Sequence, residues 1–250
     1  MIRTLYQYSS RLSDDQKKRL RTLGRKLPWL VDAVAFLFRR NLKILATIYG
    51  SDKWNFHWYA QHYEQCLASI RRKRLNLLEI GIGGYADPKA GGSSLRMWRA
   101  YLPHAHVYGI DIYDKTAHNE RRITTFAGSQ IDTGFLDSVV EKIGRIDLIV
   151  DDGSHINAHV IATFRHLFPH LADGGLYIVE DIETSYWPSD GNVTDRNDPQ
   201  TSMGFFKSLV DGLNHEEFHH VYEPTYFDLN IKSIFFYHNL VIINKSKNQR

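Results

Sequence analysis

The middle of the chain repeats one pattern, a short apolar run followed by a segment long enough for a helix. The runs lie at residues 75–80, 106–111, 122–126, 146–152 and 175–181, and the helix-length segments at 93–101, 133–143 and 156–171. Strands and helices that alternate in this way are typical of βαβ units and a parallel sheet. Two further runs, 233–237 and 239–243, predict late strands at an antiparallel edge. We therefore expect an α/β protein with a mostly parallel seven-stranded sheet and helices on both faces.

The composition fits one domain of ordinary size together with a basic arm. Of the 250 residues, 43% are hydrophobic and 24% are charged, as in globular proteins. Residues 1–50 hold eleven Lys and Arg but three Asp and Glu, whereas the rest of the chain is net acidic. We predict a basic amphipathic helical arm over residues 1–47 and a second domain over residues 48–250. The net charge of +3 is too small to predict nucleic-acid binding.

Cysteine content and hydropathy exclude several protein classes. Cys66 is the only cysteine, so the chain cannot form an intramolecular disulfide or a metal site built from several cysteines. No apolar run approaches the ~20 residues that span a bilayer. The polar residues after Met1 do not resemble a signal peptide. We expect a soluble, cytoplasmic protein.

Within the arm, an apolar segment at residues 29–38 is followed by Arg39 and Arg40, and Pro28 breaks or restarts a helix. One interpretation is a membrane-surface anchor with basic flanks. The other is an arm packed on the body of the protein or on a second subunit. We expect the second, because buried helices share this pattern, and with it a homo-oligomer.

A glycine-rich turn follows the first predicted strand. Gly81, Gly83 and Ala86 match the loose dinucleotide fingerprint Gly-x-Gly-x-x-Ala. That fingerprint needs a helix to begin at once, so that the helix N-terminus meets a pyrophosphate, but residues 87–92 intervene here. An NAD(P) site and an ordinary glycine turn stay as alternatives.

Two acids beside this turn favour a different ligand, S-adenosylmethionine (SAM). Glu79 precedes the turn, and Asp111 ends the second predicted strand, placed to accept hydrogen bonds from two ribose hydroxyls. Ligands of open α/β sheets bind at the carboxyl ends of the strands, which is where both acids lie. Ser129 and Gln130 follow the third strand, in a loop placed to contact an adenine. We therefore predict a SAM pocket.

The fourth and fifth predicted strands both end in acids. Asp152 follows the fourth strand, and Glu180 and Asp181 end the fifth. Carboxylates this close repel one another unless a cation lies between them, and oxygen ligands favour Mg²⁺ or Ca²⁺. His155 follows Asp152 by three residues, where a neutral imidazole can take a proton from a substrate hydroxyl. We predict a metal site with a general base; helix caps, surface pairs and a packing histidine are the alternative.

Two other histidine motifs predict different metal chemistry. His215 and His219 enclose a literal H-E-x-x-H, but glycine and asparagine just before it disfavour the helix that a zinc protease needs. His155, His159 and Asp152 have the composition of a two-histidine, one-carboxylate iron site. We expect neither to be the main site.

A long polar segment, residues 183–204, comes directly after the fifth predicted strand. Long loops inside compact domains are usually functional or disordered. Its position next to the carboxylates predicts a lid over the site.

The order and content of these motifs resemble the metal-dependent sugar O-methyltransferases of macrolide antibiotic pathways. The resemblance covers about residues 48–243 and includes short mycobacterial proteins that act on sugars of glycolipids and polysaccharides. The residues that carry it lie at 78–85, 90–95, 108–111, 151–155, 180–181 and 184–188, with 50–53, His57, Tyr59, Tyr63 and Glu64 before the first strand. The macrolide enzyme has a long N-terminal domain where this chain has the short arm, so the resemblance implies nothing about the arm.

The resemblance implies a class I SAM-dependent methyltransferase fold, SAM as the methyl donor and Mg²⁺ for activity. The metal ligands would be Asp152, Glu180 and Asp181, and the general base would be His155. The SAM contacts would be Glu79, Gly81, Gly83, Gly84, Tyr85, Ser94, Asp111, Ser129, Gln130 and Asp147.

The acceptor implied by the resemblance is a sugar, either a deoxysugar of a macrolide or glycolipid or a mannose-type sugar of a methylated polysaccharide. Tyr186 and Trp187 would stack on its ring. Two alternatives remain, an Fe(II)/2-oxoglutarate hydroxylase and a non-catalytic SAM-binding module.

Overall fold

The computed structural model describes residues 28–187 and 195–248, which form two compact units. Of the described residues, the first unit comprises 28–73 and Gly92–His104, and the second comprises Arg74–Gly91, 105–187 and 195–248. The charged segment 14–20 of the predicted arm lies outside the described residues. Among the described residues, no helix is long and apolar enough to cross a membrane.

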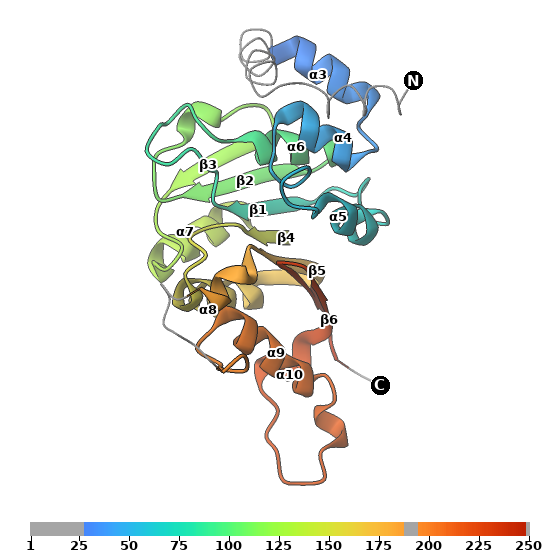
Figure 1. Cartoon of the computed structure of the whole chain (residues 1–250), viewed down its shortest axis with the longest axis vertical. Helices are drawn as coiled ribbons and strands as arrows, with labels where there is room; N and C mark the ends of the chain where they lie inside the picture. The colour runs from blue at the N-terminus through green and yellow to red at the C-terminus, as the bar shows by residue number, and fades with distance from the viewer. Residues whose placement is uncertain (1–27, 188–194, 249–250) are drawn as a thin grey trace. The chain divides into compact units, whose positions relative to one another are not determined.

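The second unit is built on a seven-stranded sheet with the order β3-β2-β1-β4-β5-β7-β6 (Figure 1). The strands are β1 (Asn76–Ile80), β2 (His106–Asp111), β3 (Ile123–Ala127), β4 (Ile146–Asp151), β5 (Leu171–Glu180), β6 (Ile231–Tyr237) and β7 (Leu240–Lys245). Strands β1 to β5 are parallel, and β7 is antiparallel to both β5 and β6. The predicted mostly parallel sheet with an antiparallel edge is confirmed.

The strand register brings the predicted site residues to one edge of the sheet. Ile80 pairs with both Ile110 and Asp151, and Asp151 pairs with Val179. The residues that follow these positions therefore leave the sheet side by side. In a doubly wound sheet, this carboxyl edge next to the reversal of strand order is where ligands bind.

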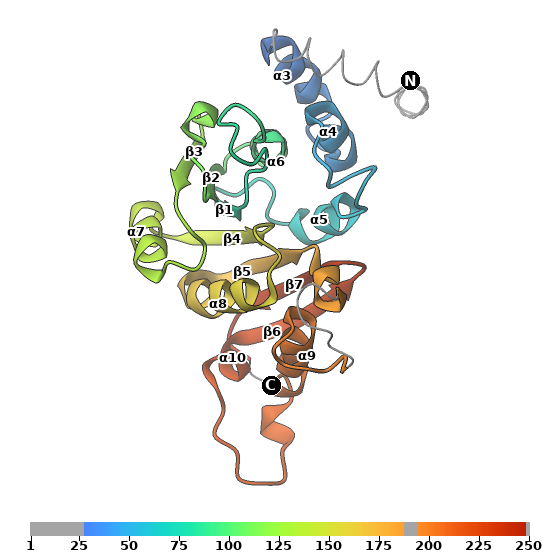
Figure 2. The same ribbon diagram turned by 60° about the vertical axis from the view of Figure 1, so that its left-hand side comes forward.

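The helices of the second unit are α7 (Thr133–Ile143), α8 (Asn157–Leu167), α9 (Ser202–Gly212) and the short α10 (Tyr226–Asn230). Figure 2 shows α8 along strands β4 and β5. The apolar face of α8 is buried, and the Phe164 ring lies about 5 Å from the rings of Phe168, Tyr177 and Phe206. Burying a side chain of this size contributes roughly 1.5–3 kcal/mol to folding, so this cluster fixes α8 on the sheet.

The first unit contains α3 (Pro28–Leu37), α4 (Leu42–Tyr49), α5 (Ala60–Leu67) and α6 (Ser93–Tyr101). A helix begins at Pro28 as expected. Asn41 caps α4 by accepting a hydrogen bond from Ile44 N at 3.0 Å, and Arg99 of α6 pairs with Asp32 of α3 at 2.8 Å. The packed arm stays a prediction, with the membrane-surface anchor as its alternative.

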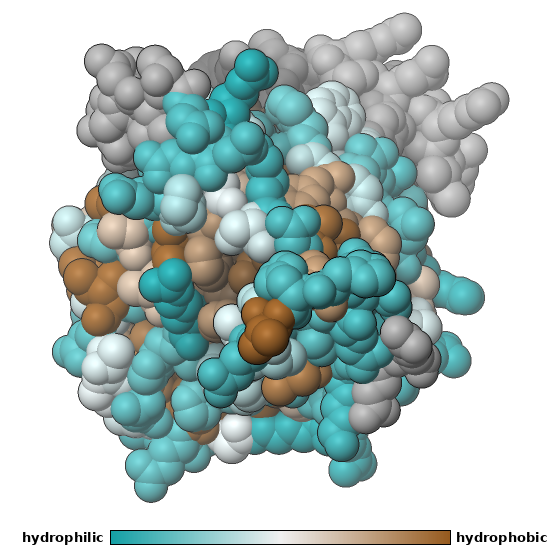
Figure 3. Space-filling view, turned by 90° about the horizontal axis from the view of Figure 1, so that it is seen from below, coloured by the Kyte–Doolittle hydropathy of each residue, from teal (hydrophilic) through white to brown (hydrophobic). Residues whose placement is uncertain are grey.

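Residues 213–225 project at the lower end of Figure 1, between α9 and α10. Seen from this end, most of the visible surface is hydrophilic, and apolar side chains gather in separate groups (Figure 3). The H-E-x-x-H motif lies here, and its first residues form only a 3-10 turn, η5 (His215–Glu217). His215 is buried, with Nδ1 2.9 Å from the Gly212 carbonyl oxygen. A zinc-protease helix is therefore absent from this described segment.

Candidate active site

The turn after β1 needs glycine for steric reasons. Gly81 has a φ of +89°, and a Cβ atom there would overlap the Asp152 carbonyl oxygen. Gly84 has a φ of +82°, and a Cβ atom there would overlap the backbone of Ala90. The first of these close approaches joins the end of β1 to the end of β4. The predicted SAM turn and the predicted metal residues are thus neighbours along the sheet edge.

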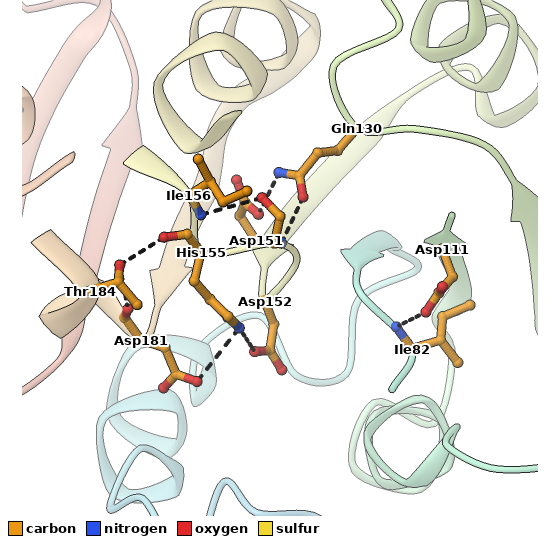
Figure 4. A network of polar contacts seen from close by, with 10 residues as sticks. Ile82, Asp111, Gln130, Asp151, Asp152, His155, Ile156, Asp181 and Thr184 are labelled. Atoms are coloured by element: carbon orange, nitrogen blue, oxygen red, sulfur yellow. Dashed lines mark hydrogen bonds and ion pairs between the residues drawn. The ribbon is translucent and has the colours of Figure 1, made fainter. Parts of the chain in front are cut away.

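Asp111 at the end of β2 faces this turn. Its Oδ2 accepts a hydrogen bond from Ile82 N at 3.0 Å (Figure 4). Its Oδ1 accepts one from Tyr113 N at 3.0 Å. Each carboxylate oxygen has a second lone pair, so both can still accept a hydrogen bond from a diol. This geometry fits a ribose.

The buried Lys115 binds the backbone of the glycine loop, the segment 81–92 between β1 and α6. Its side chain is fully buried, and Nζ donates to the carbonyl oxygens of Tyr85 at 2.6 Å, Asp87 at 2.8 Å and Ala90 at 3.3 Å. Sequence reasoning missed this residue, because its position in a polar loop carries no signal of burial. Lys115 gives a long loop the rigidity that a ligand pocket needs.

The ends of β4 and β5 bring Asp152, His155 and Asp181 together (Figure 4). His155 Nε2 lies 3.8 Å from Asp152 Oδ1 and 3.8 Å from Asp181 Oδ2. One ligand atom from each of the three residues lies within 4.8 Å of the others, so the group has the size of a metal site. Both His155 (φ 55°) and Asp181 (φ 52°) have left-handed backbones, which are uncommon for such residues and concentrate at functional sites.

Buried polar contacts hold this strained geometry. Thr184 Oγ1 donates to the His155 carbonyl oxygen at 2.8 Å, from the 3-10 turn η3 (Ile182–Tyr186). Asn157 Oδ1, at the start of α8, accepts hydrogen bonds from Ser185 Oγ at 3.2 Å and from Ser202 N at 2.8 Å. The turn η3 and the beginnings of α8 and α9 are thereby joined around the site.

Comparisons with known proteins found similar methyltransferases. Residues 88–182 match a methyltransferase domain family. The chain is 47% identical over 208 residues to 8-demethyl-8-alpha-L-rhamnosyl tetracenomycin-C 2'-O-methyltransferase of Streptomyces olivaceus, covering 82% of this chain and 54% of that protein. It is 42% identical over 212 residues to mycinamicin VI 2''-O-methyltransferase of Micromonospora griseorubida, covering 83% of this chain and 53% of that protein.

The chain is a homologue of these O-methyltransferases. A solved structure of the MycE methyltransferase from the mycinamycin pathway, in complex with Mg and SAH, superimposes with a TM-score of 0.81 at 42% identity. The match covers 84% of this chain and 54% of that one, and the shared fold is the class I SAM-methyltransferase fold. The chain therefore spans about half the length of the relatives it matches.

One predicted SAM residue of this methyltransferase homologue, Asp147, does not lie at the carboxyl edge. Asp147 lies at the opposite, amino end of β4, where it accepts hydrogen bonds from Asn76 N at 2.9 Å and Arg145 Nε at 2.7 Å. Ser94 lies in α6 of the first unit. The structure does not bring Asp147 to the glycine turn, because the acid begins its strand instead of ending it.

Gln130 reaches the edge but has both ends of its amide engaged. Its Oε1 accepts from Ser154 N at 2.8 Å, and its Nε2 donates to Thr163 Oγ1 at 3.0 Å and to Asp151 Oδ1 at 3.4 Å. These hydrogen bonds hold Gln130 against the turn after β4 that carries Asp152.

Burial, together with the nearby charge of Asp152, raises the pKa of Asp151 to about 7.

The remaining predicted residues differ in exposure. Glu79 is fully buried near the end of β1, whereas Tyr85 is 87% exposed at the glycine turn. Ser129 lies in the loop after β3, where its Oγ accepts from Ile131 N at 3.4 Å. Glu180 is only 3% exposed and lies outside the three-donor cluster of Asp152, His155 and Asp181 among the described residues.

A pocket of about 260 Å³ adjoins the cluster. It is lined by Ser154, His155, Ile156, Asp181, Glu183, Thr184 and Trp187. Trp187 and Tyr186 are each about half exposed. The predicted lid 183–204 begins within η3 and ends in α9, so it is not one continuous loop. Its residues 188–194 lie outside the described residues.

The arrangement does not favour the two-histidine iron site. His155 lies before α8 and not on it, so it does not share a helix face with His159. His159 Nδ1 instead lies 3.0 Å from Ser154 Oγ. The described cluster is therefore two carboxylates with one imidazole.

Proposed function

We propose that this chain transfers a methyl group from SAM to a hydroxyl of a sugar carried by a small molecule, with Mg²⁺ as a required ion. One arrangement carries the proposal. His155 Nε2 lies between the carboxylates of Asp152 and Asp181, at the same edge of the sheet as the glycine turn after β1. The relatives named above are O-methyltransferases, one of them for a rhamnosyl group. Rhamnosides are accordingly the first acceptors to test.

SAM would bind along the turn from Gly81 to Tyr85, with Asp111 accepting hydrogen bonds from the ribose. Backbone amides and a carboxylate suffice for this ligand, because it has no pyrophosphate that needs a helix N-terminus. Ser129 would lie beside the adenine. Glu79 would support the wall of this pocket from a buried position, and Gln130 through its hydrogen bond from Ser154 N.

The residues present fit a magnesium ion. Asp152 and Asp181 offer the carboxylate oxygens that Mg²⁺ prefers, and Glu180 is the proposed third ligand. When bound, the ion would act as a Lewis acid that lowers the pKa of the sugar hydroxyl.

His155 would act as the general base. Its imidazole would accept the hydroxyl proton at Nε2, and the charge that develops would be stabilised by the two carboxylates 3.8 Å away. The sugar oxygen then forms a bond to the SAM methyl carbon while the carbon–sulfur bond breaks. The electron pair stays on sulfur, and S-adenosylhomocysteine (SAH) leaves.

The sugar would occupy the pocket beside His155, with Trp187 at its rim. An aromatic ring offers an apolar face to the C–H side of a sugar, while the Asp181 and Glu183 carboxylates line the same pocket for its hydroxyls. This assigns the acceptor site to the same sheet edge as the base.

The test is a methyl-transfer assay on a panel of rhamnosides, mannosides and glucosides, with SAM and either Mg²⁺ or EDTA. SAH and a methylated sugar should form only with Mg²⁺ and only with a sugar acceptor. Equal turnover in EDTA, or methylation of a catechol control in place of sugars, would overturn the proposal.

A further inference from the structure

A second group of metal-binding side chains lies on the surface of the second unit, away from the sheet edge. Asp137 on α7, His166 on α8 and His170 at the end of the 3-10 turn η2 (Phe168–His170) each offer a ligand atom within 4.8 Å of the other two. His166 Nε2 lies 2.8 Å from Asp137 Oδ1, and the rings of His166 and His170 lie 5.8 Å apart. Helices α7 and α8 lie side by side in both ribbon views (Figures 1 and 2).

The local chain geometry explains how the two histidines meet. They are four residues apart, and residues with this spacing share a helix face. Helix α8 ends at Leu167, but Phe168 keeps helical angles (φ −58°, ψ −39°) and η2 continues the turn as far as His170. Two histidines with the same spacing on one helix hold zinc in metalloproteases.

The donor set selects a class of metal. Two imidazoles and one carboxylate suit zinc, nickel, cobalt and copper, whereas Mg²⁺ prefers oxygen ligands. Ligands about 2.0–2.1 Å from a tetrahedral zinc lie ~3.3 Å from one another, so the three side chains need only small rotations to bind one ion. Asp137 and His170 are exposed and His166 is partly exposed, so an ion reaches them without opening the core.

We propose that Asp137, His166 and His170 form a second metal site that binds a zinc-type divalent ion, with water completing the coordination. The site is separate from the Asp152, His155 and Asp181 cluster. His166 lies nine residues after the start of α8, which is ~14 Å along the helix. Its ion joins α7 to the end of α8 and stabilises the folded state, because the unfolded chain does not hold the three donors together.

Zinc titration by calorimetry tests this site in the full chain. The background carries Asp152→Asn and Asp181→Asn, which remove the carboxylates of the first cluster. In that background we expect one Zn²⁺ per chain, and His170→Ala or Asp137→Asn should weaken its binding by roughly tenfold or more. His104→Ala, which removes an exposed histidine of the first unit, is the matched control and should leave the affinity unchanged.

Thermal unfolding supplies an independent measurement. Zn²⁺ should raise the melting temperature of the background protein but not that of its His170→Ala variant. His170 is exposed, so its replacement leaves the core intact, and the metal-free melting temperatures of the two proteins should agree. Unchanged zinc affinity in His170→Ala and Asp137→Asn, or the same loss in His104→Ala, would overturn the proposal.

Discussion

The hydroxyl of Thr184 donates a hydrogen bond of 2.8 Å to the backbone carbonyl oxygen of His155. It joins the turn after β5 to the turn between β4 and α8, where His155 has a left-handed backbone. Such a conformation costs on the order of 1–2 kcal/mol and persists only when its surroundings hold it. The direction of the His155 imidazole therefore depends on the side chain of Thr184.

Replacing Thr184 tests this dependence. Thr184→Val removes the hydroxyl and keeps the shape, whereas Thr184→Ser keeps the hydroxyl. A lost hydrogen bond of about 0.5–1.5 kcal/mol corresponds to a kcat lowered about 2- to 10-fold in Thr184→Val. Thr184→Ser should stay near the wild type, and KM for SAM should change in neither variant. Equal kcat values for the two variants would show that the bond does not position His155.

The role of His155 as general base predicts a large loss of rate. His155→Asn suits the test, because asparagine tolerates the left-handed backbone at this position. We expect kcat to fall by roughly 10²–10⁴-fold, while SAH binding measured by calorimetry survives. A variant that methylates at the wild-type rate would exclude this role.

Replacing each proposed metal ligand with its amide counterpart tests the contribution of that ligand by itself. Asp152→Asn and Asp181→Asn should each raise the Mg²⁺ concentration needed for half-maximal activity by about tenfold or more, since a charged ligand is lost. Glu180→Gln should do the same if Glu180 rotates out of its buried position to bind the ion. Wild-type Mg²⁺ dependence in Glu180→Gln would restrict the protein ligands to the two aspartates.

Lys115 is expected to control SAM affinity without contacting SAM. Lys115→Met removes a donor that three loop carbonyl oxygens share. The Asp87 oxygen keeps its hydrogen bond from Ala90 N at 3.2 Å and the Ala90 oxygen keeps His118 Nε2 at 3.1 Å, so the main cost, about 1–3 kcal/mol, falls on the Tyr85 oxygen. KM for SAM should rise and the melting temperature should fall. Lys89→Met, in an exposed position of the same loop, is the control. Similar KM values in both variants would contradict the role of Lys115.

Cys66 should be unreactive in the folded chain. Burial raises the pKa of its thiol from 9.0 to about 12. Between pH 9.0 and about pH 12, the Cys66 thiol ionises in the unfolded chain but stays protonated in the folded chain. The free energy of unfolding therefore falls as the pH rises through this range. Alkylation by iodoacetamide at pH 8 should be slow until the protein is denatured. Fast alkylation of the native protein would show that the thiol is accessible.

The sequence predicted the sheet because each parallel strand is a short apolar run that ends at glycine or an acid. Strand β4 shows the limit of this reasoning, since it begins near Asp147 and ends at Asp151. Both acids flank the same apolar residues, but the parallel register and the hydrogen bond from Asn76 N place Asp147 at the amino edge.

Residues that meet only in three dimensions were beyond prediction. Lys115 looks like an ordinary loop lysine, and its burial follows from how the glycine loop folds over it. The spacing of His166 and His170 is visible in the sequence, but Pro169 between them argues against a helix, and Asp137 comes from another helix. The start of α9 did have a local signal, because Thr201 caps it by accepting from Gly204 N at 3.0 Å.

Calorimetric titration of SAH into the full chain, with and without Mg²⁺, tests SAM binding at this sheet edge whatever the acceptor is. We predict micromolar binding by the wild type and a large loss of affinity in Asp111→Ala, which removes the carboxylate proposed to hold the ribose. After SAH is bound, a rhamnoside should give heat only in the presence of Mg²⁺. No heat from SAH under either condition would contradict the assignment of this site as a SAM pocket.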